Sequence, residues 1–353
     1  MEKIGVAVLG ATGSVGQRFV QLLAEHPWFE LKAVTGSERR VGKEYGETCR
    51  WILSEPMPEG ARKIRVVPTE PGSVDVSLVF SALPSDVARV KEPLFAAAGI
   101  GVCSNAGAFR RDVDVPILLP EVNADHVELV RRQRAARGWK GYIVTNPNCT
   151  STGMTIALKA LQDAFGLDTV FAVSMQAVSG AGYPGVPSMD ILDNVIPFIS
   201  NEEEKVEWEP RKMLGRLGAD GVEPADFKIS VQTNRVAVSD GHLVCLAVKL
   251  RDRVSPEASM AALSAYELPA SCVDLPSRPQ PVIRVRTEPD RPQPRLDRMS
   301  GAGMTTVVGR VRRDPVLDLR MVVLSHNTIR GAAGGSIFNA ELLFRSGLLP
   351  EPS

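Results

Sequence analysis

A strand, a glycine-rich turn and a helix follow one another at the N-terminus, and no other feature constrains the fold as strongly. The apolar run 4–9 leads into Gly10, Gly13 and Gly16, spaced G-x-x-G-x-x-G, and apolar residues then recur at helical spacing over 15–23. By itself the glycine spacing is just as typical of a tight turn. Between a strand and a helix it predicts a dinucleotide site, because glycines let the backbone approach a pyrophosphate whose charge the helix amides meet.

The end of the second predicted strand indicates which dinucleotide binds. An NAD-specific site usually places an acidic residue there for the ribose 2′-hydroxyl, whereas this chain has Thr35-Gly36 followed by Ser37, Arg39 and Arg40. Two guanidinium groups favour a 2′-phosphate. We therefore expect NADP(H), and the alternative is a solvated basic turn.

Strand and helix patterns alternate up to about residue 148. The strand-like runs "IRVVP", "VSLVFSAL" and "GIGVCSN" alternate with a helical stretch over 85–98, as expected of a parallel Rossmann-type sheet covered by helices. Ligands bind at the carboxyl ends of such strands, so the segments 81–83 and 104–105 should face the ligand crevice.

The pattern changes after Cys149. A predicted helix over 150–161 is followed by longer strands, such as "KISVQTNRVAV" and "LRMVVLSHN", that alternate apolar with polar or small residues. The proline-rich stretch 269–294 predicts an edge strand or an extended arm, and the helical spacing of 331–349 predicts a segment that packs back on the first domain.

At 353 residues the chain suits two domains of an α/β protein. We expect an NADP-binding Rossmann-type domain of residues 1–148 plus 330–353. Residues 149–329 would form an α+β catalytic and dimerisation domain with a mixed or antiparallel sheet.

Composition restricts the class of partner. The 41 acidic residues balance the 41 basic ones, so no excess of charge points to nucleic acid or to a membrane. The first apolar run is too short to span a bilayer and has no cleavage site behind it, so we expect a cytoplasmic protein. Five cysteines without a C-x-x-C pair predict reduced thiols and no metal site, and four of them are expected to be small buried side chains.

The remaining cysteine, Cys149, stands in "NPNCTSTG", where a strand-like run gives way to a helix. The positive end of a helix dipole lowers the pKa of a thiol, as a nucleophile requires; the alternative is a buried structural cysteine. His242 follows the turn Asp240-Gly241 at the start of an apolar strand, where it can act as acid and base near neutral pH. Arg235 offers a planar fork for a carboxylate.

Glu202 and Lys205 stand three residues apart on a charged predicted helix. Residues at this spacing share one face, so the pair can present both charges to a zwitterionic, phosphorylated substrate. The alternative is a solvated helix face.

Eight segments spread over nearly the whole chain carry a resemblance to a known family: "GATGSVG", "SNAGAFRRDVDVPILLPEVN", "NPNCTSTG", "QAVSGAGYPG", "EEEKVEWE", "NRVAVSDGH", "RPQPRLDR" and "SHNTIRGAAGGS". Together they resemble aspartate-semialdehyde dehydrogenases, and in particular the archaeal and fungal branch. The most specific part is "NPNCT" with "NRV" and "DGH" downstream.

The resemblance implies NADPH-dependent reductive dephosphorylation of 4-phospho-L-aspartate to L-aspartate 4-semialdehyde through a thioester on Cys149, in lysine, methionine and threonine biosynthesis. The catalytic residues would be Cys149, His242, Gln176 and Asn148, of which Asn148 is a candidate donor to the carbonyl oxygen. In the substrate site, Arg235 would hold carboxylate, Glu202 ammonium, and Arg110, Lys205 and Asn105 phosphate. The NADP-binding residues would be Gly10, Thr12, Gly13, Ser14, Val15, Ser37, Arg39, Arg40, Ser81, Leu83, Ser179, Gly180 and Asn327.

Two residues depart from the family pattern. Ala237 replaces the proline of the more usual "NRVPV", which removes a rigid turn but no chemical group. Pro210 lies inside the charged helix and is expected to kink it or to end it one turn early.

Three other functions fit the sequence less well. Malonyl-CoA reductases use the same chemistry, but their cysteine context resembles "TPLCT", and that of N-acetyl-glutamyl-phosphate reductases resembles "PGCY"; neither matches "NPNCT". A non-catalytic NADP-binding protein on this fold should lack the nucleophile or the base, and both are present. An open sheet and a proline-rich arm further predict burial against a second subunit, and the resemblance implies a homodimer or homotetramer.

Overall fold

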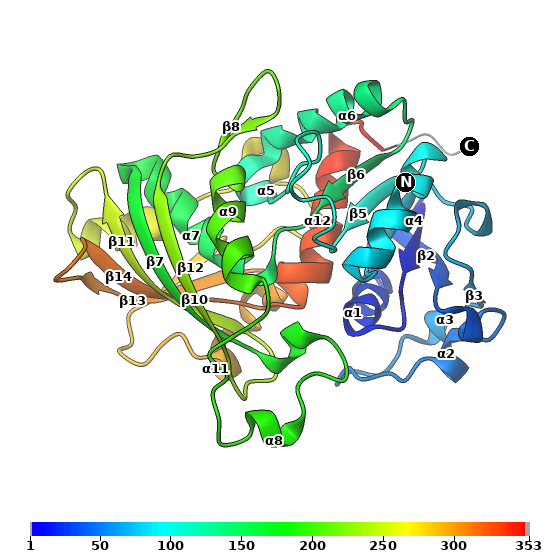
Figure 1. Cartoon of the computed structure of the whole chain (residues 1–353), viewed down its shortest axis with the longest axis horizontal. Coiled ribbons are helices and arrows are strands. Elements are labelled where there is room, and N and C mark those ends of the chain that lie inside the picture. The colour runs from blue at the N-terminus through cyan, green and yellow to red at the C-terminus, as the bar shows by residue number, and fades with distance from the viewer. Residues whose placement is uncertain (1, 350–353) are drawn as a thin grey trace.

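The computed structural model describes residues 2–349, whose strands form two six-stranded sheets side by side (Figure 1). All strands of the first sheet are parallel, in the order β3-β2-β1-β4-β5-β6. They are β1 (Ile4–Leu9), β2 (Phe29–Thr35), β3 (Val66–Val67), β4 (Leu78–Ser81), β5 (Gly101–Ser104) and β6 (Tyr142–Thr145). The strand order reverses between β1 and β4, which is where a Rossmann-type sheet binds its ligand.

Helices cover both faces of this sheet because its strands are apolar on both sides. In β1, Val6 and Val8 pack in one core with Phe19 of α1, whereas Leu9 packs on the opposite face in a core with Phe95 of α4. These helices are α1 (Ser14–Leu23) and α4 (Ser85–Ala97). The alternation of side chains along a strand therefore places a core on each face.

The C-terminal helix α12 (Gly334–Arg345) joins the first of these two cores, where Phe338 packs in one cluster with Phe19. In Figure 1 this helix, drawn in red, lies in the middle of the molecule. The helical spacing of 331–349 thus marked a segment that returns to the first sheet.

The second sheet is mixed, in the order β10-β7-β11-β14-β13-β12. Its strands are β7 (Leu167–Gln176), β10 (Lys228–Arg235), β11 (His242–Leu250), β12 (Ile283–Arg286), β13 (Thr306–Arg313) and β14 (Leu319–Ser325). The pairs β10–β7 and β12–β13 are parallel and the others antiparallel. β12 lies at an edge, as predicted for the proline-rich stretch, since proline cannot donate to a central ladder.

Helices α7 (Cys149–Phe165), α9 (Glu202–Met213) and α10 (Pro256–Ser264) pack against this second sheet. The remaining α-helices of residues 2–349 are α2 (Tyr45–Thr48), α3 (Glu59–Arg62), α5 (Pro120–Asn123), α6 (Leu129–Arg137), α8 (Ser188–Ile191) and α11 (Pro294–Asp297). Strands β8 (Arg216–Leu217) and β9 (Val222–Glu223) form a small separate hairpin. Among residues 2–349, no helix has both the length and the apolar character needed to cross a membrane.

Pro210 does not end α9 one turn early, because the helix continues for three further residues to Met213. A proline inside a helix removes one backbone hydrogen bond. Packing of Val206 and Met213 in the core of the second domain holds the helix across that gap.

The face of the second sheet away from α7 is open. Phe171 of β7 is 41% exposed, and its neighbours Val173 and Met175 are partly exposed. Cys245 of β11 lies opposite Val173 and is also partly exposed, so the expectation that it is buried was wrong; Cys49, Cys103 and Cys272 are buried as expected. All five cysteines are free thiols.

Candidate active site

The loop between β6 and α7 carries Cys149 into the space between the two sheets. Asn148 caps α7: its Oδ1 accepts hydrogen bonds from the backbone N–H groups of Thr150 (2.8 Å) and Ser151 (3.2 Å). The cap satisfies two amides that the helix itself leaves unpaired. Cys149 is therefore the first helical residue, and its Sγ lies 3.2 Å from Nε2 of His242 at the start of β11.

A cavity of about 800 Å³ extends from Cys149 to the glycine-rich turn at the start of α1. It brings together most of the predicted site: Gly13, Ser14, Val15, Leu83, Asn105, Arg110, Asn148, Cys149, Gln176, Ser179, Gly180, Glu202, Lys205, Arg235 and Asn327. His242 lies buried beside it. The predicted residues Gly10, Thr12, Ser37, Arg39, Arg40 and Ser81 do not line it.

The environment of Cys149 opposes ionisation of the resting thiol. Burial raises the pKa of Cys149 to about 12, and the charge of Glu202 adds to this effect, while Arg110 and Arg235 act against it. The expectation that a helix N-terminus yields a low thiol pKa is therefore not met in the free protein. Desolvation of the thiolate outweighs the helix dipole.

His242 is held as a neutral imidazole. Burial lowers the pKa of His242 to about 3, and the cation of Arg235 lowers it further. Its Nδ1 accepts a hydrogen bond from the backbone N–H of Ala177 (3.1 Å), so the neutral ring carries its hydrogen on Nε2, facing Cys149. In this tautomer Nε2–H donates to a thiolate or to a reacting oxygen.

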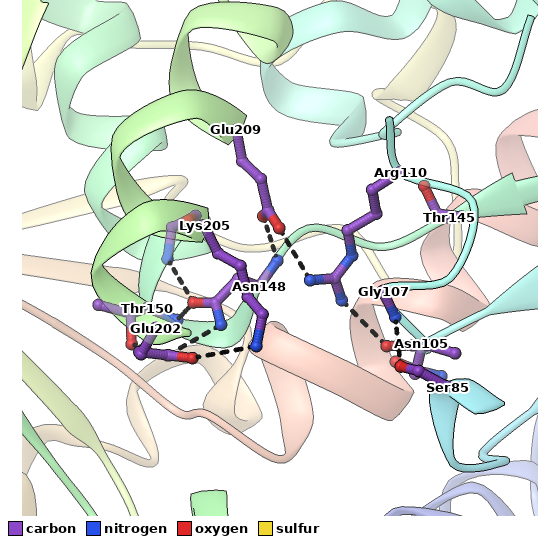
Figure 2. A network of polar contacts seen from close by, with 12 residues as sticks. Ser85, Asn105, Gly107, Arg110, Thr145, Asn148, Thr150, Glu202, Lys205 and Glu209 are labelled. Carbon is purple, nitrogen blue, oxygen red and sulfur yellow. Dashed lines mark hydrogen bonds and ion pairs between the residues drawn. The ribbon is translucent and has the colours of Figure 1, made fainter. Parts of the chain in front are cut away.

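A second group of polar side chains surrounds Glu202, which is buried on α9 (Figure 2). Its Oε1 accepts hydrogen bonds from Asn148 Nδ2 (2.8 Å) and Gln176 Nε2 (3.1 Å), and Lys205 Nζ lies 3.8 Å from Oε2. The structure thus brings the predicted Glu202–Lys205 pair to the cavity. Asn148 is both the helix cap and a donor to Glu202, which leaves one amide hydrogen for a substrate.

Arg110 reaches the same cavity from the loop that follows β5 (Figure 2). Its guanidinium is buried and donates to Oε1 of Glu209 (2.9 Å) and to the carbonyl oxygen of Asn105 (3.0 Å). Among the described residues its Nε has no hydrogen-bond partner. A buried cationic donor without a partner fits an anionic ligand.

The loop after β7 lies against the Cys149–His242 pair. A Cβ atom on Gly180 would lie 2.8 Å from Arg235 Nη1 and 3.0 Å from His242 Nε2, so a side chain here requires one of these groups or the loop to shift. Asn327 anchors the loop by donating to Ser179 Oγ (2.8 Å), while its Oδ1 accepts from the backbone of Gly241 (2.8 Å).

The glycine-rich turn fits a dinucleotide. Gly10 has φ +72°, and a Cβ atom on Gly16 would lie 2.3 Å from the carbonyl oxygen of Gly10. Gly13 precedes α1 without a side-chain cap, so the first helical amides remain available to an anion. Arg39 and Arg40 lie beyond the end of the neighbouring strand β2 and form none of the ion pairs found among residues 2–349.

Sequence reasoning missed two residues at this site. Glu209 lies seven residues after Glu202, which is two helical turns along the same face of α9, and this spacing was the available signal. Gly331 approaches so closely that a Cβ atom there would lie 2.9 Å from Cβ of Cys149. No local pattern indicates that approach, because the two residues are far apart in the sequence.

Two protein-family models match this chain and define its class of enzyme. The family described as "Semialdehyde dehydrogenase, NAD binding domain" matches residues 5–130, and "Semialdehyde dehydrogenase, dimerisation domain" matches residues 158–330. A parallel dinucleotide-binding sheet, a second mixed sheet and a cysteine beside a histidine are thus those of a semialdehyde dehydrogenase.

Individual relatives narrow this to one family. Aspartate-semialdehyde dehydrogenase of Archaeoglobus fulgidus is 54% identical over 98% of this chain and 100% of its own, and that of Saccharomyces cerevisiae is 44% identical over 97% and 98%. The crystal structure of the Candida albicans enzyme with NADP has a TM-score of 0.90 at 43% identity, covering 98% of this chain and 100% of that one. The chain belongs to the aspartate-semialdehyde dehydrogenase family, and the predicted family and fold class are confirmed.

Proposed function

We propose that this enzyme uses NADPH to reduce 4-phospho-L-aspartate to L-aspartate 4-semialdehyde with release of phosphate, a step in lysine, methionine and threonine biosynthesis. The observation that carries the proposal is the contact of 3.2 Å between Cys149 Sγ and His242 Nε2 in a cavity that also reaches the glycine-rich turn. The activity, enzyme class and cofactor are those of the family to which the chain belongs.

The polar groups around Cys149 match the three charged ends of the substrate. Arg235 would pair with the α-carboxylate and Glu202 with the ammonium group. Arg110, whose Nε is unpaired among the described residues, would bind the phosphoryl group together with Lys205, while Asn105 orients Arg110 through its carbonyl oxygen.

The reaction passes through a covalent acyl enzyme. Sγ of Cys149 attacks the acyl carbon, the C–O bond to phosphate breaks, and the leaving phosphate takes up the proton that the thiol loses. Bound NADPH supplies the hydride that reduces the thioester. The resulting hemithioacetal then releases the semialdehyde as its C–S bond breaks, and the departing sulfur takes up the proton that the overall reaction consumes, which restores the thiol of Cys149.

The chain's own groups stabilise the charges that develop. Because the resting thiol has a raised pKa, the positive charges of Arg235 and Arg110 and the donor Nε2–H of His242 must stabilise the thiolate when it forms. The backbone amide of Cys149 has no acceptor within the helix and would donate to the substrate oxygen, with Asn148 Nδ2 beside it. Gln176, fixed by Glu202, would orient the acyl group.

The cofactor would lie across the carboxyl ends of β1 and β4. The turn residues Gly10 to Val15 would hold the pyrophosphate, with Ser81 and Leu83 beneath it, and Ser37, Arg39 and Arg40 the 2′-phosphate. Ser179, Gly180 and Asn327 would face the nicotinamide end, which places it next to Cys149.

The test is phosphate-dependent reduction of NADP by the purified protein with L-aspartate 4-semialdehyde. Malonate semialdehyde with CoA, and N-acetyl-glutamate 5-semialdehyde with phosphate, are run in parallel. Turnover only with the first substrate supports the proposal, and turnover mainly with malonate semialdehyde would indicate a malonyl-CoA reductase. A Cys149→Ala variant should lose turnover and keep NADPH affinity; unchanged turnover would exclude Cys149 as the nucleophile.

The assembly and location are also proposals. The open face around Phe171 and Val173 is apolar and belongs to the region matched as a dimerisation domain, so we expect a second copy to cover it in a homodimer or homotetramer. Phe171→Asp should dissociate that assembly in light scattering, and a variant of unchanged mass would point to another face. Five free thiols suit the reducing cytoplasm.

We further propose domain boundaries at residues 1–148 plus 330–353 and at 149–329. The parallel sheet ends with β6 at Thr145, and α12 packs in its core. Residues 1 and 350–353 lie outside the described part of the chain.

A further inference from the structure

A buried carboxylate on α9 joins the two halves of the site without lining the cavity. Glu209 is fully buried and lies one residue before the proline of α9. Its Oε1 accepts from Arg110 Nη1 (2.9 Å), and its Oε2 accepts from the backbone N–H of Asn148 (2.6 Å), as Figure 2 shows. Each carboxylate oxygen is therefore committed to a different segment of the site.

The two segments follow neighbouring strands of the first sheet, β5 and β6, whereas Glu209 lies on α9, which packs against the second sheet. Arg110 belongs to the loop after β5 of the first sheet, and Asn148 directly precedes the nucleophile at the start of α7. Glu209 is 99 residues from Arg110 and 61 from Asn148 in sequence. A single side chain thus contacts both the arginine that faces the phosphoryl position and the residue that precedes the attacking cysteine.

The rest of α9 holds the same two segments. One turn further on, Lys212 Nζ donates to the carbonyl oxygens of Arg110 (2.8 Å), Asp112 (2.8 Å) and Val115 (2.9 Å). Two turns earlier, Glu202 accepts from the side chain of Asn148 (2.8 Å). Asn148 is therefore held by α9 at both its backbone and its side chain.

Burial of the Glu209 carboxylate costs desolvation free energy, which its hydrogen-bond partners offset. Burial raises the pKa of Glu209, while Arg110 and the Asn148 N–H act in the opposite direction. A charge this deep needs its partners. Arg110 in turn uses one hydrogen of Nη1 on Glu209 and one of Nη2 on the carbonyl oxygen of Asn105, which leaves its other N–H groups, Nε among them, for a ligand.

We infer that Glu209 is a positioning residue that sets Arg110 and Asn148, and through them the phosphate site and Cys149, at the separation that attack on the acyl phosphate requires. This inference rests on the proposed function. Glu209 touches neither substrate nor cofactor, since it does not line the cavity. The alternative role is that of a structural counter-ion for Arg110.

The experiment measures the phosphate dependence of NADP reduction with L-aspartate 4-semialdehyde. Glu209→Gln retains the shape but offers one acceptor for two donors, so we expect the KM for phosphate to rise about tenfold and kcat to fall, with the Kd of NADP within twofold of wild type. Glu207→Gln is the matched control, because Glu207 lies on the same helix and accepts a backbone N–H from Val231 (3.1 Å) away from the cavity. That variant should keep both constants within twofold.

A double-variant comparison separates positioning from a general loss of stability. If Glu209 acts through Arg110, then adding Glu209→Gln to Arg110→Met should change the phosphate KM less than twofold, because the group it positions is already gone. Additive penalties would overturn the inference, as would a phosphate KM for Glu209→Gln equal to that of wild type. An inactive wild-type enzyme would instead refute the proposed function.

A second pair of variants tests the inference if Glu209→Gln does not fold. Arg110→Met removes one buried charge and Arg110→Met/Glu209→Met removes both. In each variant the alkylation of Cys149 by iodoacetamide is followed by mass spectrometry of its peptide. Loss of the acceptor for the Asn148 N–H should slow or speed alkylation at least threefold relative to Arg110→Met. Equal rates, or a double variant that shows no folded circular dichroism spectrum, would assign Glu209 a structural role alone.

Discussion

Replacing Gly180 with alanine introduces one methyl group at the point where the loop after β7 lies against the Cys149–His242 pair. The new Cβ atom would lie 2.8 Å from Arg235 Nη1 and 3.0 Å from both Cε1 and Nε2 of His242. Ordinary contact begins at 3.4 Å, so these neighbours, or the loop itself, must move by about 0.6 Å and 0.4 Å. The methyl group therefore competes for space with the histidine that faces Cys149.

Neither neighbour can move freely. Arg235 Nη1 donates to the carbonyl oxygen of Ala177 (2.8 Å), and His242 Nδ1 accepts from the N–H of the same residue (3.1 Å). A displacement of half an ångström lengthens the 3.2 Å contact between Nε2 and Sγ. Since a misplacement of about 1 Å can reduce a rate roughly 100-fold, we expect kcat/KM to fall about 10- to 100-fold, or about 1.4 to 2.7 kcal/mol of transition-state stabilisation.

The assay is steady-state NADP reduction with saturating phosphate, together with the Kd of NADP and the thermal midpoint. Gly60→Ala is the control, because a Cβ atom there meets nothing within 4 Å. Activity of Gly180→Ala within threefold of wild type would refute the argument, as the loop would then yield without disturbing His242.

Three further predictions concern the proton, the thiol and the cofactor. His242→Asn should lower kcat by roughly 10²- to 10⁴-fold at unchanged NADPH affinity, since it removes the group that faces Sγ; a loss below tenfold in rapid-mixing kinetics would argue against that role. With a Cys149 pKa of about 12 and a His242 pKa of about 3, the resting pair is a neutral thiol and imidazole, and alkylation of Cys149 in the free enzyme should accelerate about tenfold per pH unit from pH 7 to 9. A plateau in that range would reveal a preformed thiolate–imidazolium pair. Replacing Arg39 and Arg40 together with alanine should raise the KM for NADP about 10- to 100-fold and leave the KM for NAD nearly unchanged. An equal rise in both KM values would show that these two arginines do not bind the 2′-phosphate.

The sequence by itself determined the features that depend on neighbouring residues. The strand, glycines and helix at 4–23 predicted the dinucleotide turn, because positive φ and close approach at Gly10 and Gly16 are local demands. The helix start at Cys149 and the edge strand within 269–294 were likewise readable, since a cap and a proline act within a few residues.

Only the tertiary structure decided which distant residues meet. The sulfur of Cys149 and the ring of His242 are 93 residues apart, and the Glu209 carboxylate reaches Arg110 across 99 residues. No periodicity records such contacts, because they depend on how two separate sheets pack. The contacts of Glu209 with Arg110 and Asn148 could be identified only from the tertiary structure.

The pKa of Cys149 likewise depends on both the local sequence and the tertiary structure. Its position at a helix N-terminus is a local property and predicted a lowered value, whereas the structure gives a raised one. Helix dipoles act on neighbouring groups within one turn, but desolvation depends on everything that encloses the thiol. The sequence thus predicted which residue is the nucleophile, whereas the fold around Cys149 sets the pKa of its thiol.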